Sequence, residues 1–340
     1  MIPVGAVASK TSNTIGGPEV ISEVFPDESD PYERARGNGY DVVSAIFDTA
    51  PDSDCRVPWQ MTLDTSAALH AHIEYEIIPP GSQEGRVFVE LSGQRLQVVS
   101  FGNGPRILLA HGGWVGSWEL WQQPFELMSP DWRCVSYDHR GSGESPTDPQ
   151  SISPHVLVDD LFAVMDHLDI ERCVVAGESL GAVVVLQAAH QAPERFDGLV
   201  IVAGAPVIAA SSVGDLIAGS RSNYPATVAA FVKACVPAED GKHLRRWGRN
   251  LLNRAEPEAA ARLLECYLDA DAPEVPLEEI ATPALVIHSK DDAIVPSAAG
   301  KWIASRLPDA TLVELEDGGH VPTITRPSQV VDAIRARFDS

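Results

Sequence analysis

A serine lies between two closely spaced glycines in the stretch Gly177-Glu-Ser-Leu-Gly181, which joins the apolar run CVVA to a second apolar run. A serine that presents its hydroxyl from a sharp turn between a strand and a helix needs small neighbours on both sides. The positive N-terminal end of the following helix favours negative charge beside it. This spacing can arise by chance in a chain with 26 glycines, but its position predicts that Ser179 is a nucleophile.

A serine hydroxyl becomes a good nucleophile only when a base removes its proton, and histidine is the usual base. His320 follows the predicted strand TLVEL in the stretch DGGHVP, where Gly318 and Gly319 allow the backbone to turn the ring inward. His111 also ends a predicted strand, and the glycines after it predict a role in shaping a loop. We expect solvated positions for His139, His155, His167, His190 and His243.

The histidine base in turn needs a carboxylate that holds one tautomer and stabilises the imidazolium. The stretch ALVIHSKDDAIVP places Asp291 and Asp292 directly after a predicted buried strand, at the same sheet edge as Ser179. Either carboxylate fits on this evidence alone. The one that is not used would lie in a solvated acidic turn.

The oxyanion that forms during acyl transfer needs two N–H donors held in place. The residue after the nucleophile, Leu180, offers one of them at the start of a helix. The loop AHGGW, residues 110–114, contains glycines that allow its backbone to approach closely. Gly113 is the predicted second donor, with Trp114 as the neighbouring alternative.

These candidates follow short apolar runs that alternate with amphipathic helices, as in a parallel sheet covered on both faces. The helix over 157–168 is one example, with Asp160 expected on its solvent side. The stretches RVFVEL and RLQVVSF, with a turn at Ser92-Gly93, predict an antiparallel hairpin before the parallel part. The predicted fold class is α/β, a mostly parallel, doubly wound sheet whose buried strands are 107–110, 134–137, 173–176, 199–202, 284–288 and 311–315.

Two segments depart from this alternation. Residues 208–280 contain helical segments and no convincing strand, so we expect a helical cap above a core formed by 87–207 and 281–340. Residues 1–86 hold fourteen Asp and Glu against five Lys and Arg, and the first 70 contain too few apolar residues for a core. This N-terminal extension is predicted to be partly disordered, or to pack on its own domain or on a second subunit of a homo-oligomer.

Five motifs make the sequence similar to the α/β-hydrolase superfamily over about residues 87–340: HGGW at 111, YDHRGSGES at 137, GESLG at 177, SKDDAIVP at 289 and GGHVP at 318. The order of Ser179, an aspartate and His320 is that of the family's catalytic triad. The resemblance implies that Asp292 is the acid, that residues 138–143 form a structural turn and that the insertion is the cap. Ser289 stands where the family usually has glycine, so Asp291 stays open as the acid.

The composition excludes several classes of partner. The chain has 340 residues and a formal net charge of −23, which argues against nucleic acid or an anionic membrane as a partner, because both attract positive surfaces. Its five cysteines are scattered without metal-ligand spacing, which favours a reducing, cytoplasmic location. The N-terminal stretch MIPVGAVASK lacks the basic flank of a signal peptide, and no apolar run reaches the roughly 18 residues of a membrane span.

The residues and the resemblance together predict a serine hydrolase that cleaves a carboxylic ester or lactone through an acyl-enzyme, with no metal or organic cofactor. Trp114 and the apolar cap predict a hydrophobic small-molecule substrate, whereas Trp118 and Trp121 fit helix packing at least as well as substrate contact. Three alternatives remain. They are a carbon–carbon bond hydrolase, a cofactor-free perhydrolase of the same fold, and a ligand-sensing receptor on a hydrolase scaffold.

Overall fold

The computed structural model describes residues 85–91, 93–237, 241–269 and 272–339. The predicted N-terminal extension lies almost entirely outside these ranges. The homo-oligomer contact assigned to it lies outside them too, so both stay predictions.

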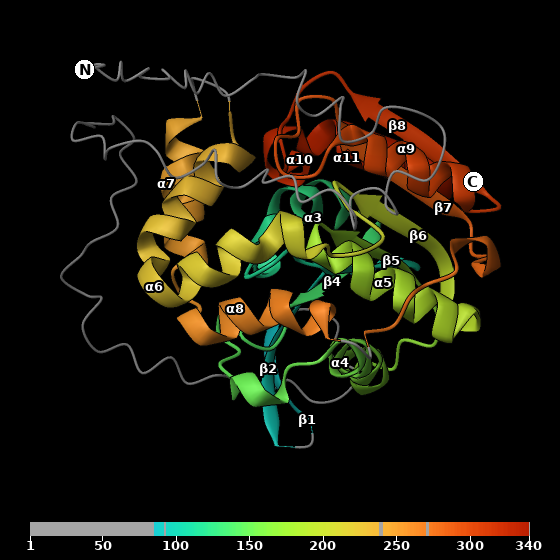
Figure 1. Cartoon of the computed structure of the whole chain (residues 1–340). Helices are drawn as coiled ribbons and strands as arrows, with labels where there is room; N and C mark the ends of the chain where they lie inside the picture. The colour runs from blue at the N-terminus through green and yellow to red at the C-terminus, as the bar shows by residue number, and fades with distance from the viewer. Residues whose placement is uncertain (1–84, 92, 238–240, 270–271, 340) are drawn as a thin grey trace, which may run out of the picture.

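Eight strands form one sheet in the order β1-β2-β4-β3-β5-β6-β7-β8 (Figure 1). The first two strands form an antiparallel hairpin, and β2 is also antiparallel to β4, whereas the remaining neighbours are parallel. This arrangement confirms the predicted mostly parallel α/β fold with an antiparallel entry. The strands are β1 (Gly85–Leu91), β2 (Gln94–Phe101), β3 (Arg106–His111), β4 (Trp132–Tyr137), β5 (Cys173–Glu178), β6 (Phe196–Val202), β7 (Ala284–Ser289) and β8 (Ala310–Leu315).

Helices connect the parallel strands and pack on the sheet. α5 contacts β5 and β6 and has α4 beside it, α9 contacts β7 and β8, and α3 lies beside α11. No helix within the described ranges combines the length and apolar composition needed to cross a lipid bilayer. The helices outside the β6–β7 connection are α3 (Gln122–Met128), α4 (Pro154–His167), α5 (Leu180–Gln191), α9 (Ser297–Arg306), α10 (Pro322–Thr325) and α11 (Pro327–Phe338).

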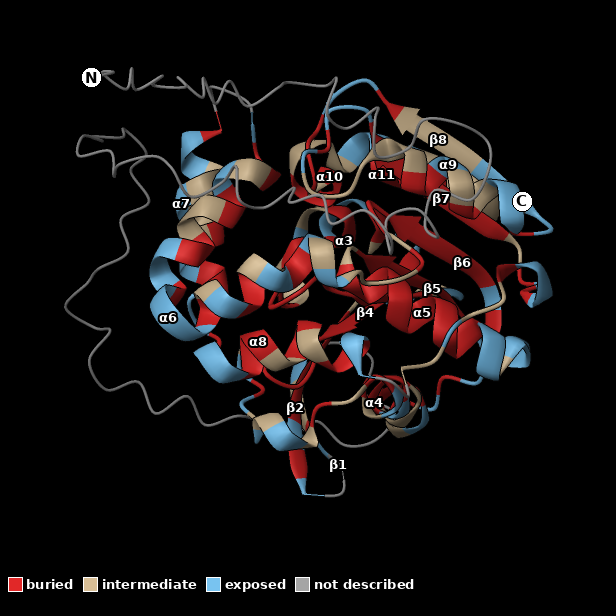
Figure 2. Ribbon diagram, in the orientation of Figure 1, coloured by how far each residue is buried: buried red, intermediate tan, exposed pale blue. Residues whose placement is uncertain are grey.

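The core lies along the central strands and α5. Every residue of β5 and β7 is buried, and Figure 2 shows these strands and α5 almost wholly in the buried colour. β8 differs, because only its last residue is buried and four others are half-buried. The prediction that 311–315 is buried on both faces is therefore wrong. β8 is an edge strand with β7 as its single neighbour, so one of its sides lacks a covering strand.

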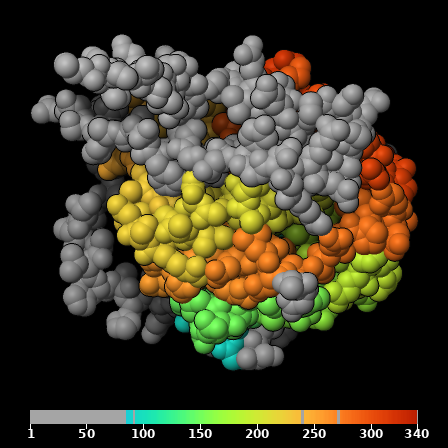
Figure 3. Space-filling model, viewed as in Figure 1, coloured from blue at the N-terminus to red at the C-terminus, as the bar shows by residue number. Residues whose placement is uncertain are grey.

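In the described part of the connection between β6 and β7 there are three α-helices, which lie together on one side of the molecule (Figure 1). α6 (Ala210–Cys235) packs against both α7 (Lys242–Leu252) and α8 (Pro257–Glu265), and α6 and α8 form adjacent yellow and orange surfaces in Figure 3. α6 is kinked at Asn223, two residues before Pro225, because proline removes a backbone donor and crowds the preceding turn.

The charged face expected for the helix over 157–168 is only partly exposed. Asp160 of α4 is buried, which contradicts its predicted place on the solvent side. It forms a bidentate ion pair with Arg140, with two N–O distances of 2.7 Å. Arg140 belongs to the loop after β4. The ion pair between Arg140 and Asp160 therefore connects the predicted structural turn at 138–143 to α4.

We expect Arg140→Met to lower the free energy of unfolding by about 3–5 kcal/mol, because it leaves the Asp160 carboxylate buried without a partner. Urea denaturation followed by circular dichroism measures the change. The exposed pair of Arg172 and Asp197 is the control, and Arg172→Met should cost less than about 1 kcal/mol. Equal losses in the two variants would contradict the structural role given to the buried pair.

Candidate active site

Ser179 lies in the turn between β5 and α5, with φ of 54° and ψ of −117°. A residue other than glycine rarely adopts these backbone angles, and they are tolerated where the surrounding packing enforces them. A Cβ atom on Gly177 would collide with the carbonyl oxygen of Gly181, and one on Gly181 would lie 2.6 Å from the carbonyl oxygen of Gly112. Both glycines of the motif are therefore required by the turn, as the sequence predicts.

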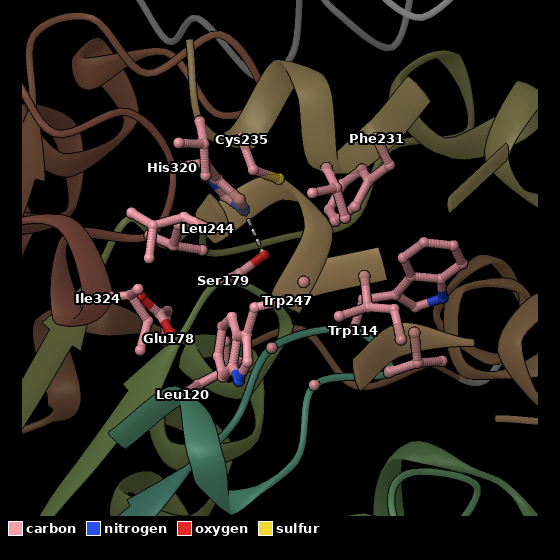
Figure 4. A pocket seen from close by; sticks show the side chains of 18 residues that line it. Trp114, Leu120, Glu178, Ser179, Phe231, Cys235, Leu244, Trp247, His320 and Ile324 are labelled. Carbon is pink, nitrogen blue, oxygen red and sulfur yellow. Dashed lines mark hydrogen bonds between the residues drawn. The ribbon is translucent and has the colours of Figure 1, made fainter. Parts of the chain in front are cut away.

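His320 connects Ser179 to a buried carboxylate. Its Nε2 lies 2.8 Å from Ser179 Oγ, and its Nδ1 lies 2.9 Å from Asp292 Oδ2. In the tautomer that satisfies both contacts, Nδ1–H donates to the carboxylate and Nε2 accepts from the serine hydroxyl. Figure 4 shows the serine and the histidine facing each other at one wall of the pocket.

The two neighbouring aspartates make different contacts. Asp291 Oδ1 accepts a hydrogen bond of 2.9 Å from the backbone N–H of Gly319, whereas Asp292 Oδ1 accepts from the N–H groups of Ile294 and Val295 at 2.8 and 3.0 Å. The structure thus places Asp292 against His320, and Asp291 against the loop that carries this histidine.

Asp292 is fully buried, yet it stays ionised. Burial by itself raises the pKa of this carboxyl, but the charge of His320 and hydrogen bonds from His288 and His320 outweigh burial and hold the pKa well below its usual range. An ionised carboxylate is what a histidine base needs as its partner.

The loop after β3 approaches Ser179 closely. A Cβ atom on Gly113 would lie 3.2 Å from Ser179 Cβ and 3.8 Å from its Oγ. The Gly112 carbonyl lies 2.7 Å from His111 Nδ1, and the Gly113 carbonyl accepts from Gly116 N–H. Because the N–H of a trans peptide points away from the carbonyl, these contacts fix the directions of the Gly113 and Trp114 N–H groups. Leu180, the other predicted donor, is the first residue of α5.

His139 lies in the interior, so its predicted solvated position is wrong. Its ring stacks on His111 with centroids 4.9 Å apart, and its Nε2 lies 3.0 Å from the Gly113 carbonyl oxygen. Burial lowers the pKa of His139, and it lowers the pKa of His111 to about 3 with a smaller contribution from His139. In both rings burial therefore favours the neutral form, and His139 contacts the glycine loop directly.

An apolar pocket, partly open to solvent, lies over Ser179 and His320. Trp114 lines it as predicted, whereas Trp118 and Trp121 are not among the lining residues. Gly113, predicted as an oxyanion donor, lines the pocket too. The pattern of the sequence did not single out the other lining residues, of which those from Phe231 to Leu252 lie in the segment 208–280. They are Val115, Gly116, Leu120, Glu178, Phe231, Val232, Cys235, Val236, Leu244, Trp247, Gly248, Leu252, Val321 and Ile324.

Trp114 connects the loop after β3 to the helices between β6 and β7. Its indole Nε1–H donates to the Ala260 carbonyl at 2.8 Å, and its ring packs edge-on against Phe231 with centroids 5.0 Å apart. Cys235, at the end of α6, accepts a backbone hydrogen bond of 2.9 Å from His320 N–H. The helices between β6 and β7 therefore contact both the glycine loop after β3 and the loop that carries His320.

Residues 107–333 match the family model described as the alpha/beta hydrolase family. The chain belongs to this family. A Pseudomonas syringae protein assigned as the carbamate hydrolase RutD is 30% identical over 239 residues, which cover 67% of this chain and 92% of that protein. The pimeloyl-[acyl-carrier protein] methyl ester esterase of Nitrosomonas europaea is 29% identical over 71% of this chain and 98% of its own.

Solved structures show the same fold. The enol-lactonase from Burkholderia xenovorans superposes with a TM-score of 0.68 at 21% identity, covering 74% of this chain and all of the lactonase. This similarity in fold agrees with the resemblance that the five sequence motifs indicate.

Glu178 directly precedes Ser179, and the shift in its pKa predicts how the stability of the protein depends on pH. Burial raises its pKa to about 8, although a 2.7 Å hydrogen bond from Thr323 Oγ1 to Glu178 Oε1 acts in the other direction. In the unfolded chain this carboxyl ionises near its ordinary pKa of 4.5. Between these two pH values the folded state keeps a proton that the unfolded state has lost, so the free energy of unfolding falls as pH rises.

We therefore expect Glu178→Gln to become progressively more stable than the wild type between pH 5 and pH 8, because the amide imitates the neutral acid and does not titrate. Melting temperatures measured across this range test the expectation. A constant difference between the two proteins would show that Glu178 does not hold its proton in the folded state.

Proposed function

We propose that this protein is a serine hydrolase that cleaves a carboxylic ester or lactone with an apolar acyl group through an acyl-enzyme intermediate. The observation that carries the proposal is the hydrogen-bonded chain from Ser179 through His320 to Asp292 at the base of an apolar pocket. Membership of the α/β hydrolase family supports the same reading.

The geometry supports a two-stage reaction. Ser179 Oγ attacks the substrate carbonyl carbon while His320 Nε2 takes the hydroxyl proton, and the Leu180 and Gly113 N–H groups bind the oxyanion. His320 then gives the proton to the leaving alcohol, which departs as the C–O bond breaks. A water molecule attacks the acyl-enzyme with His320 again as base, and the acid product leaves with Ser179 restored. Asp292 holds the imidazolium in both stages.

The lining of the pocket supports a neutral, apolar substrate. Among the described residues that line it there is no lysine or arginine, so a substrate carboxylate would lose its hydration without gaining a cationic partner from them. Phe231 and Trp247 offer flat apolar surfaces beside the nucleophile. A carbamate is a second candidate, since its carbonyl accepts the same attack and the Pseudomonas syringae relative is assigned that activity.

A reducing, cytoplasmic location is part of the proposal. The four cysteines within the described ranges, Cys134, Cys173, Cys235 and Cys266, are free and buried. A small-molecule substrate, with neither nucleic acid nor membrane as partner, fits the negative charge of the chain.

The proposal is tested by mixing the enzyme with 4-nitrophenyl esters of graded acyl length and a 4-nitrophenyl carbamate, and measuring nitrophenolate release together with the intact mass. The wild type should show a burst, an acyl adduct and turnover that is fastest with apolar acyl groups. Ser179→Ala should show no adduct and lose at least about a thousandfold in kcat. Turnover that survives in Ser179→Ala would exclude the acyl-enzyme mechanism, and an adduct that never turns over would favour the receptor alternative.

The adjacent aspartates provide a matched pair. We expect Asp292→Asn to lower kcat by about 10⁴-fold, because an amide no longer stabilises the imidazolium or selects the required tautomer of His320. Asp291→Asn keeps an oxygen that accepts from Gly319 N–H, so kcat should stay within a few fold of the wild type. Steady-state kinetics with one ester compares the two variants. The reverse order of effects would make Asp291 the acid.

A further inference from the structure

Asp292 has a second histidine neighbour that the proposed mechanism does not use. His288 is the penultimate residue of β7, four residues before Asp292, and its side chain is fully buried. Its Nε2 lies 3.2 Å from Asp292 Oδ2 and 2.9 Å from the carbonyl oxygen of Val295. Val295 N–H donates to the other carboxylate oxygen of Asp292, so His288 and the turn after Asp292 enclose this carboxylate together.

The packing around His288 selects one tautomer of its ring. Nδ1 is buried without a hydrogen-bond partner. α9 covers this nitrogen so closely that a Cβ atom on Gly300 would lie 2.7 Å from it. A proton on Nδ1 would therefore be buried with no acceptor, whereas a proton on Nε2 has two acceptors within reach. His288 thus carries its proton on Nε2 and donates it between Asp292 and Val295.

The carboxylate of Asp292 is consequently held by four donors. Oδ1 accepts from two backbone N–H groups, and Oδ2 lies within reach of the two histidine rings. Three of these donors belong to the β7 strand and the turn that follows it, and only His320 comes from another segment. Removing His288 would leave Oδ2 to His320 alone and would free one side of the carboxylate to rotate.

We propose that His288 is a positioning residue for the triad: its Nε2–H orients the Asp292 carboxylate and takes up part of its negative charge. The proposal rests on the hydrolase mechanism proposed above, since its effect reaches the substrate only through Asp292 and His320.

Other titratable groups surround this cluster and stay in place when His288 is changed. Glu314 of β8 is the sheet partner of His288 and pairs with Lys301 of α9 at 3.0 Å. On the side of the nucleophile, burial raises the pKa values of Glu178 and Cys235, and the Asp292 charge adds to both increases. Because these groups are common to every His288 variant, differences among the variants report on the His288 donor.

The test compares two variants. His288→Leu removes the hydrogen-bond donor, whereas His288→Gln keeps a side-chain N–H donor at a similar distance from the backbone. Without the donor, the full charge of Asp292 acts on His320 and favours its imidazolium form. We expect the acid limb of the kcat/KM profile in His288→Leu to move up by at least about half a pH unit. We also expect kcat to fall at least tenfold with KM within a few fold, because the carboxylate loses its orientation. His288→Gln should restore both quantities to within about threefold and 0.2 pH unit.

A role in packing alone predicts another pattern. The acid limb would then stay in place or move down in His288→Leu, and His288→Gln would be no better than His288→Leu. Either result overturns the proposal.

A second measurement needs no variant. Long-range ¹H–¹⁵N correlation spectra of the histidine-labelled wild type should show the His288 proton on Nε2, and a proton on Nδ1 would overturn the proposal. This spectrum is recorded without substrate. The spectrum therefore tests the hydrogen bond between His288 and Asp292 independently of the proposed function. The test remains valid even if turnover by Ser179→Ala has excluded that function.

Discussion

The strained turn at Ser179 is the constraint around which the other parts of the site are arranged. Its backbone angles bring the end of β5 into α5 within a single residue, and the glycine loop after β3 packs directly against it. Because carbonyl oxygens occupy the space where side chains would extend from Gly177 and Gly181, this packing holds the serine in a conformation that it would otherwise leave.

Two buried carboxyl groups near the serine have opposite ionisation states, and their surroundings explain the difference. Asp292 is ionised because two histidines and two backbone N–H groups surround it. Glu178 has a hydroxyl donor on one oxygen and no partner on the other, so burial prevails and raises its pKa to about 8. Asp292 therefore places a negative charge on the side of His320 that faces away from Ser179, whereas Glu178 adds an uncharged group to the lining of the pocket.

The helices between β6 and β7 complete the site rather than only covering it. They supply Phe231, Leu244 and Trp247 to the pocket, and the Cys235 carbonyl holds the backbone N–H of His320. The cap and the histidine loop are thus joined by a hydrogen bond.

The sequence by itself determined the fold class, the turn at Ser179 and the candidates at the strand ends, because these depend on local spacing. Apolar runs of strand length indicate buried strands, and a serine between glycines indicates a turn that no larger residue permits. The choice between Asp291 and Asp292 was different. Neighbouring side chains in a turn point in different directions, and only the path of the distant His320 loop decides which of them it meets.

The tertiary structure alone decided which polar residues are buried. Asp160, His139 and His288 are unremarkable in sequence, yet each lies in the interior opposite a partner far along the chain or across a turn. The pocket likewise combines residues from the glycine loop, β5, the helices between β6 and β7, and α10, which lie as far apart along the chain as Gly113 and Ile324. Burial and pairing across such distances follow from how the elements pack, and local periodicity carries no record of that packing.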